Sequence, residues 1–318
     1  MKILFVTSNR LGDAVLSTGL LDHLIRAHPD ARITVVCGPA AEGVFARMPN
    51  RERTIVLRKQ SWGRHWLPLW ADVASHVWDL VVDIRGSALA WLVPTRRRAV
   101  FHRVGGPKIN QLGAILGLSP APSPVAWTSQ ADQRHLTDLL PIDRPIIALA
   151  PTANWGPKVW PADRFAEVFR RLADQDVSGR SRRANAVPVI LGGPGLTEHA
   201  MAEPLLALLP DAVDLVGRLT LPEVVACLER AVLFIGNDSG LMHLSAATGT
   251  PTIGLFGPTD AETYGPSGRV AAAVVGTSMA SITVDQVERA AEAMLDQRPR
   301  ADSSAANVVV TSRPVVSS

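Results

Sequence analysis

Small and polar residues follow an apolar stretch near residue 236 and form a candidate phosphate site. The stretch Phe234–Gly236 predicts a strand, and Asp238-Ser239-Gly240 then predicts a turn that opens a helix, with His243 near its first turn. The first amides of a helix have no partner within it, so this end attracts anions such as phosphate. Alternatively, Asp238 or Ser239 is only a helix cap and His243 an ordinary helix residue. Their position at the carboxyl end of a strand, where open α/β sheets bind ligands, favours the binding role.

A second candidate loop, Pro151–Pro161, also lies between a predicted strand and a predicted helix. Lys158 is the only cation in this loop. We expect Lys158 to lie across a cleft from the Asp238 helix, where its charge would neutralise a diphosphate leaving group, and Thr152 to hydrogen-bond a phosphate oxygen. The alternative for Lys158 is an ordinary solvated lysine.

The third candidate is Asp13, which follows the first predicted strand within the stretch Ser8–Ser17. Gly12 permits a close backbone approach, and a carboxylate at a helix start is either a capping residue or a base aimed at a substrate. In the first half of the sequence, no other Asp or Glu follows a strand in so glycine-rich a turn. This context favours the base.

Several other classes of site lack their sequence signature. The glycine patterns of dinucleotide-binding and P-loop proteins are absent, and no cluster of His, Cys and Asp has metal-ligand spacing. The two cysteines, Cys37 and Cys227, are too few for a disulfide framework, and we expect both to be buried. The sequence therefore predicts neither a metal site nor a cofactor.

Short apolar runs alternate with longer amphipathic segments along most of the 318 residues, which predicts an α/β protein with parallel sheets. A Pro-rich stretch, 119–130, separates two such series. We therefore expect two Rossmann-like doubly wound domains, at 1–140 and 141–298, and a disordered tail at 299–318. The expected strands are Lys2–Thr7, Arg32–Cys37, Thr54–Leu57, Leu80–Ile84, Ala99–Val104, Pro145–Ala150, Val187–Leu191, Asp214–Val216, Leu233–Gly236 and Thr252–Phe256, and one helix is expected over Asp13–Ala27.

Positive charge is concentrated in the first half. Residues 1–140 contain 17 Lys and Arg against 10 Asp and Glu, whereas residues 141–318 contain 15 against 19. An anionic partner is therefore expected for the first domain. The candidate residues, some interleaved with tryptophans, are Arg58, Lys59, Arg64, Arg96, Arg97 and Arg98. The mixture suits a phosphorylated lipid headgroup at a membrane surface, or else is a solvated basic face with core tryptophans. Nucleic acid is not expected, because the basic residues form neither one helix nor a stacking platform.

Taken together, the Gly236–Pro258 block, the Pro151–Pro161 loop and the Gly12-Asp13 start resemble the ADP-heptose:lipopolysaccharide heptosyltransferases, glycosyltransferase family 9, from Met1 to about Gln297. The resemblance implies a GT-B fold with its site in the cleft between two domains, and an inverting, metal-independent sugar transfer from a nucleotide diphosphate. The sugar would be heptose from ADP-heptose and the acceptor a lipopolysaccharide core or a related phosphorylated, lipid-linked saccharide.

The resemblance also implies roles for the candidate residues. Asp13 is then the general base, Lys158 and the Ser239-Gly240 helix start hold the diphosphate near His243, and Asp238 orients the donor sugar. Leu219 packs on the base of the nucleotide, and Glu198 contacts the ribose. Where some members of the family have a Thr-Thr pair before the lysine, this sequence has Thr152-Ala153 at a different spacing.

Other functions would fit parts of this pattern. A sugar-nucleotide epimerase or hydrolase of related architecture would need a diphosphate site and a carboxylate, but no acceptor groove. A family member with another nucleotide sugar, or a non-catalytic nucleotide-sugar-binding protein, is a further alternative. No apolar run reaches the roughly 18 residues of a membrane span, and Met1 leads directly into a strand, so we expect a cytoplasmic protein with peripheral contact at the inner membrane face.

Overall fold

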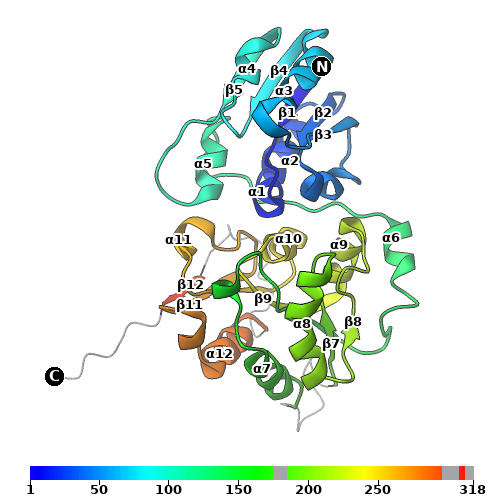
Figure 1. Ribbon diagram of the computed structural model, residues 1–318, viewed down its shortest axis with the longest axis vertical. Helices are drawn as coiled ribbons and strands as arrows, with labels where there is room; N and C mark the ends of the chain where they lie inside the picture. The colour runs from blue at the N-terminus through cyan, green and yellow to red at the C-terminus, as the bar shows by residue number, and fades with distance from the viewer. Residues whose placement is uncertain (175–184, 296–307, 312–318) are drawn as a thin grey trace, which may run out of the picture. The chain divides into compact units, whose positions relative to one another are not determined.

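The chain divides into two units by its internal contacts, Met1–Trp127 and Thr128–Ser318. The computed structural model describes residues 1–174, 185–295 and 308–311 (Figure 1). We predicted the boundary at residue 140, whereas the division by contacts falls earlier, after Trp127. Helix α6 (Gln130–His135) contacts α9 (Leu221–Arg230), and Arg230 donates a 2.6 Å hydrogen bond to the carbonyl of Pro141. These contacts hold the segment after residue 128 on the second unit.

The first unit contains a parallel five-stranded sheet in the order β3-β2-β1-β4-β5. Apolar side chains of its central strands are fully buried, as expected for a sheet covered on both faces. The predicted fifth strand lies four residues too late, because β5 begins with exposed arginines that carry no apolar signal. The elements are β1 (Lys2–Val6), α1 (Leu11–Leu16), α2 (Thr18–Ala27), β2 (Arg32–Cys37), η1 (Pro39–Phe45), β3 (Arg51–Val56), η2 (Ser61–Gly63), α3 (Trp66–Ala74), β4 (Trp78–Asp83), α4 (Leu89–Leu92), β5 (Thr95–Val100) and α5 (Lys108–Ala114).

The helix expected over Asp13–Ala27 is broken into two at Ser17. The Ser17 hydroxyl donates a 2.7 Å hydrogen bond to the carbonyl of Ala14 and lies 2.9 Å from the hydroxyl of Thr7. Such side-chain bonds to the preceding turn compete with regular helical pairing. The Pro-rich segment then crosses α2, where a Cβ on Gly19 would collide with the carbonyl oxygen of Pro122. Glycine is therefore required at position 19 for this close packing.

The second unit contains a parallel seven-stranded sheet in the order β12-β11-β10-β9-β6-β7-β8. We did not predict β11, whose sequence begins with three alanines, or β12, which lies within the predicted tail and pairs with β11. The other residues of 299–318 lie outside the described part of the chain. The strands are β6 (Ile146–Ala150), β7 (Val187–Ile190), β8 (Val213–Asp214), β9 (Ala231–Asn237), β10 (Thr252–Phe256), β11 (Ala271–Val275) and β12 (Val308–Thr311).

Helices cover both faces of the second sheet. Side chains of α7 (Ala162–Asp174), α8 (Leu196–Leu208) and α12 (Val284–Leu295) share one core cluster with Leu233 of β9 and Ile253 of β10. On the opposite face, α10 (Gly240–Thr248) packs so close to β10 that a Cβ on Gly254 would collide with the sulfur of Met242. Gly254 therefore allows α10 to lie against the sheet directly after β9. The short elements η3 (Gly156–Lys158), α11 (Ala261–Tyr264) and η4 (Met279–Ser281) complete this unit.

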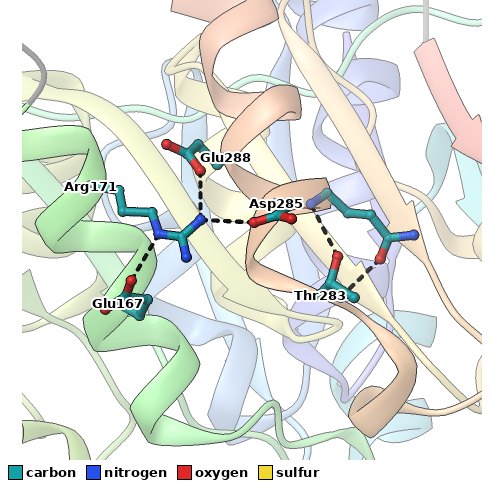
Figure 2. A network of polar contacts seen from close by, with 6 residues as sticks. Glu167, Arg171, Thr283, Asp285 and Glu288 are labelled. Carbon is teal, nitrogen blue, oxygen red and sulfur yellow. Dashed lines mark hydrogen bonds and ion pairs between the residues drawn. The ribbon is translucent and has the colours of Figure 1, made fainter.

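A polar network joins α7 to α12 on the outside of the second unit (Figure 2). Arg171 of α7 bonds Glu167 on its own helix and both Asp285 and Glu288 on α12, at 2.8, 2.8 and 3.1 Å. Hydrogen bonds to these carboxylates raise the pKa of Arg171, so its charge is retained. The network fixes α12 beside α7.

Strand order turns at one place in each sheet. In the first sheet the chain moves outward from β1 in one direction and from β4 in the other, and in the second sheet β6 and β9 mark the same change. Open α/β sheets bind ligands outside the carboxyl ends of the strands at such switch points. These observations confirm two doubly wound α/β units.

Candidate functional site

The turn between β9 and α10 lies at the switch point of the second unit. β9 ends at Asn237, and the backbone N–H of Asp238 donates a 3.1 Å hydrogen bond to the carbonyl of Leu255 on β10. The helix α10 starts where the sequence predicted, with Ser239 as its extended N-cap residue, but the Ser239 side chain does not cap the helix. Within the described residues its buried hydroxyl has no partner. The first amides of α10 are thus left for an external acceptor.

Lys158 and Asp238 form an ion pair at this turn. The Nζ atom of Lys158 lies 2.6 Å from Oδ2 of Asp238, and the two side chains are only 19% and 10% exposed. We expected Lys158 to lie across a cleft from the Asp238 helix. Instead both residues belong to one unit and are in direct contact, because the loop after β6 and the turn after β9 follow adjacent strands. Lys158 is therefore not a free solvated lysine.

Asn237 fixes the position of the lysine loop. Its Oδ1 accepts a 3.1 Å hydrogen bond from the backbone N–H of Trp160, and its Nδ2 donates a 2.8 Å hydrogen bond to the carbonyl of Pro151. Asn237 is fully buried, so these bonds satisfy backbone groups that have no access to water. Sequence reasoning missed Asn237, although its place between a strand and Asp238 was a usable signal.

The other predicted donor residues lie at the carboxyl ends of neighbouring strands. Thr152, after β6, is buried and packs near Gly192, which follows β7. Glu198, in the first turn of α8, accepts a 3.2 Å hydrogen bond from the N–H of Gly193. Leu219 is half-buried in the loop between β8 and α9, and His243 is buried within α10. The second unit thus gathers Thr152, Lys158, Glu198, Leu219, Asp238, Ser239, Gly240 and His243 along one edge of its sheet.

Asp13 lies at the switch point of the first unit. It is half-buried in the first turn of α1, and its Oδ2 accepts a 3.3 Å hydrogen bond from the hydroxyl of Ser8. The N-cap residue of α1 is Arg10, and no side chain of the described residues caps this helix. The capping alternative for Asp13 therefore has no hydrogen bond to support it.

Arg85 is a cation at the same carboxyl edge as Asp13, and sequence reasoning missed it. It follows β4, its Nη1 lies 3.4 Å from Oδ1 of Asn9, and its guanidinium is 5.3 Å from the centroid of the Trp66 ring. The buried carboxylate of Asp83 accepts hydrogen bonds from the N–H groups of Arg85 and Ser87 and so shapes this turn. A single arginine directly after an apolar strand was the signal in the sequence.

The six basic candidates lie in three different places. Arg58, Lys59 and Arg64 are exposed and follow β3, at the same carboxyl edge as Asp13. By contrast, Arg96 lies 3.4 Å from Asp79 at the amino edge and lines a shallow pocket there with Arg97 and Met1. The two edges are separated by the length of a strand, which is about 13 Å for β1 at 3.3 Å per residue. Arg98 turns towards α4, where its Nε donates a 3.0 Å hydrogen bond to the carbonyl of Ala90.

The two cysteines are buried, as the sequence predicted. Burial raises the pKa of both Cys37 and Cys227 to about 12, so both thiols keep their protons.

No group of three or more His, Cys, Asp or Glu in the described residues is arranged to hold a metal ion. Among those residues, no helix is both long and apolar enough to cross a membrane.

Comparison with known proteins identifies the family. The model of glycosyltransferase family 9 (heptosyltransferase) matches residues 96–293. The chain belongs to glycosyltransferase family 9. This membership decides for a glycosyltransferase over the epimerase, hydrolase and non-catalytic alternatives.

Relatives within glycosyltransferase family 9 align with most of the chain. Lipopolysaccharide heptosyltransferase 3 of Escherichia coli is 32% identical, over 78% of this chain and 80% of its own. Lipooligosaccharide heptosyltransferase 2 of Haemophilus influenzae is 26% identical, over 81% and 84%. The solved structure of ADP-heptose lipopolysaccharide heptosyltransferase II of E. coli superposes with a TM-score of 0.73 at 22% identity, covering 93% of this chain and 98% of that one. The predicted GT-B fold is thereby confirmed.

Proposed function

We propose that this glycosyltransferase moves heptose from ADP-heptose to a lipopolysaccharide core or a related phosphorylated, lipid-linked saccharide, with inversion and without a metal ion. Relatives that cover most of the chain carry lipopolysaccharide or lipooligosaccharide heptosyltransferase names, and one solved relative is named for ADP-heptose. The observation that carries the proposal is the Lys158–Asp238 pair beside the uncapped start of α10.

The donor diphosphate would bind at the start of α10. Amides at Ser239 and Gly240 point positive partial charge at the phosphates, close to His243. An ammonium group has three N–H donors, so Lys158 can bond a phosphate oxygen while one donor stays with Asp238. Asp238 would then offer its remaining acceptor positions to hydroxyl groups of the sugar.

The nucleoside would extend along the edge towards β8. Thr152, at the end of β6, would donate a hydrogen bond to a phosphate oxygen. Glu198 would accept a hydrogen bond from a ribose hydroxyl at Oε1, because its Oε2 already accepts one from the N–H of Gly193. Leu219, in the loop after β8, would pack on the adenine ring. The order of these residues along the sheet edge matches the order of phosphate, ribose and base.

Asp13 would act as the general base. As the acceptor hydroxyl oxygen attacks the anomeric carbon, Asp13 takes the hydroxyl proton, and the bond from that carbon to the diphosphate breaks with its electron pair leaving on the phosphate oxygen. One displacement from the opposite side inverts the anomeric centre. Lys158 and the α10 amides stabilise the charge that develops on the departing ADP, which is the task that a metal ion performs in other transferases.

The acceptor would bind to the first unit through its phosphate groups. Arg58, Lys59 and Arg64 share the carboxyl edge with Asp13, so they are the stronger candidates of the basic set. Arg96 and Arg97 lie at the opposite edge, and the guanidinium of Arg98 already donates a hydrogen bond to the carbonyl of Ala90 on α4.

Two measurements test this function. Calorimetry with ADP-heptose and with UDP- and GDP-sugars should show at least tenfold tighter binding of the ADP-sugar, and a preference for another base would redirect the proposal to a different donor. Transfer to a phosphorylated core saccharide should yield the inverted anomer by NMR and should continue in excess EDTA. Activity that EDTA abolishes and only a divalent cation restores would overturn the metal-independent mechanism.

A further inference from the structure

Large apolar side chains are exposed on η2, α3 and α4 of the first unit. Trp62 is 98% exposed and Leu67 69%, while Trp91 and Leu92 at the end of α4 are 65% and 62% exposed. Trp70, also exposed, donates a 2.9 Å hydrogen bond from its indole N–H to the carbonyl of Leu92, so α3 and α4 lie side by side. We call these five residues the tryptophan face. Exposed apolar groups of this size mark an interaction surface.

The helix periodicity of α3 shows that this exposure is specific to one side. Leu69 and Val73 are buried against the sheet, whereas Leu67 and Trp70, three positions apart, point outward together. Burying Leu67 and Trp70 as well would require a second layer on α3, and none of the described residues of this unit provides it. Trp62 stands just before α3 on a backbone with φ of 58°, which a non-glycine residue rarely adopts. The Trp62 side chain at this position is almost fully exposed.

Positive charge predominates around the tryptophan face, where the nearest carboxylates, Asp72 and Asp79, are paired with Arg53 and Arg96. The segments 57–71 and 84–98, which contain all five residues, include seven Lys and Arg and no Asp or Glu. The guanidinium of Arg98 lies 5.2 Å from the centroid of the Trp91 ring, so a cation and an aromatic ring are presented together. Indole rings prefer the boundary between headgroups and acyl chains, and Lys and Arg beside them attract anionic lipids.

We infer that the tryptophan face docks the first unit on an anionic lipid bilayer, with the indoles at the headgroup level and Arg58, Lys59 and Arg64, the cations proposed for the acceptor phosphates, facing the same headgroup layer. The three cations precede α3 at the carboxyl edge of the sheet, so the docked surface adjoins the edge that contains Asp13. A lipid-linked acceptor could then bind to the first unit while its lipid chains stay in the bilayer. This last consequence rests on the proposed function, whereas docking itself does not.

Vesicle binding tests the inference in the absence of donor and acceptor. The full chain should float with vesicles of phosphatidylglycerol and phosphatidylethanolamine, at least tenfold more than with phosphatidylcholine vesicles, and brominated lipids should quench its tryptophan fluorescence. Trp62→Ser with Trp91→Ser should lower binding at least tenfold, and Leu67→Ser with Leu92→Ser should have a similar effect. The matched control is Leu139→Ser with Ile142→Ser, two exposed apolar residues of the second unit, which should bind as wild type does.

Each outcome is decisive. The inference would be overturned if the wild-type protein does not bind anionic vesicles, or if the tryptophan variants bind them as well as wild type does. If sedimentation shows that the wild-type protein is a dimer and the tryptophan variants are monomers, the tryptophan face is a contact between two copies and the lipid assignment is wrong. Donor affinity measured by calorimetry should be the same in wild type and variants. A loss of vesicle binding with intact donor affinity therefore separates this inference from the proposed function.

Discussion

Lys158 donates a 2.6 Å hydrogen bond to Asp238 across two adjacent strands, so the charge proposed for the diphosphate is already held in place before any donor binds. An ammonium in a partly buried pair loses little conformational freedom when a phosphate arrives, which favours both binding and stabilisation of the leaving group. Under the proposed function, this relationship makes the second unit an anion site that is arranged before the donor binds.

Lys158→Ala should weaken ADP binding by at least tenfold while changing adenosine binding less than twofold, because the lysine acts on phosphate. Calorimetry with the two ligands measures this difference. Lys158→Arg is the conservative control and should recover part of the affinity. Equal losses for ADP and adenosine would remove Lys158 from the diphosphate site.

Asp13→Asn should lower kcat by about 10²-fold or more and leave the donor Kd nearly unchanged, since the side chain is proposed to accept a proton and not to hold the nucleotide. Single-turnover assays and calorimetry separate the two quantities. Asp22→Asn, on the neighbouring helix α2, is the matched control and should keep wild-type turnover. Normal turnover in the Asp13 variant would show that the carboxylate has no catalytic role.

Asn237→Ala should destabilise the protein by about 2–4 kcal/mol, because it leaves the N–H of Trp160 and the carbonyl of Pro151 buried without partners. The midpoint of urea unfolding measures the loss. Since the same bonds hold the lysine loop, the folded variant should also bind ADP more weakly than wild type. Unchanged stability would mean that water replaces both bonds.

Neutralising Arg58, Lys59 and Arg64 together by serine should raise the KM for a lipid-free phosphorylated acceptor several-fold and spare the donor Kd. The effect should shrink as salt rises, because exposed charges are screened over about 10 Å at 0.1 M. Arg96→Ser with Arg97→Ser is the comparison, and its position at the opposite edge predicts a normal KM. The reverse result would move the acceptor site to that edge.

Cys37 and Cys227 should resist iodoacetamide in the native protein at pH 8 and react fully after unfolding, because burial raises both pKa values to about 12. A thiol whose pKa is higher in the folded state keeps its proton there after the unfolded chain has lost it. Stability should therefore fall as pH rises from about 9 towards 12. Mass spectrometry of alkylated protein and unfolding curves across this range provide the measurements.

The sequence by itself determined the class of fold and located the residues that we propose for the donor site. Apolar runs separated by amphipathic segments specify parallel sheets, and glycine and polar residues directly after a strand indicate the ligand edge, because that signal is local. It predicted the β9–α10 turn, the lysine loop and Asp13. Local signals were weaker where the strand was exposed, as in β5, or rich in alanine, as in β11.

Only the tertiary structure decided which of these residues meet. Strand order β9-β6 brings Asp238 and Lys158, 80 positions apart, into contact, and it places Asn237 against both ends of the lysine loop. Residue order cannot give this, because the neighbour of a strand in a doubly wound sheet is set by the crossovers. The same topology separates Arg96 and Arg97 from Arg58 and Lys59. A run of arginines looks alike in sequence at either edge of a sheet, and only the direction of the strands distinguishes the two.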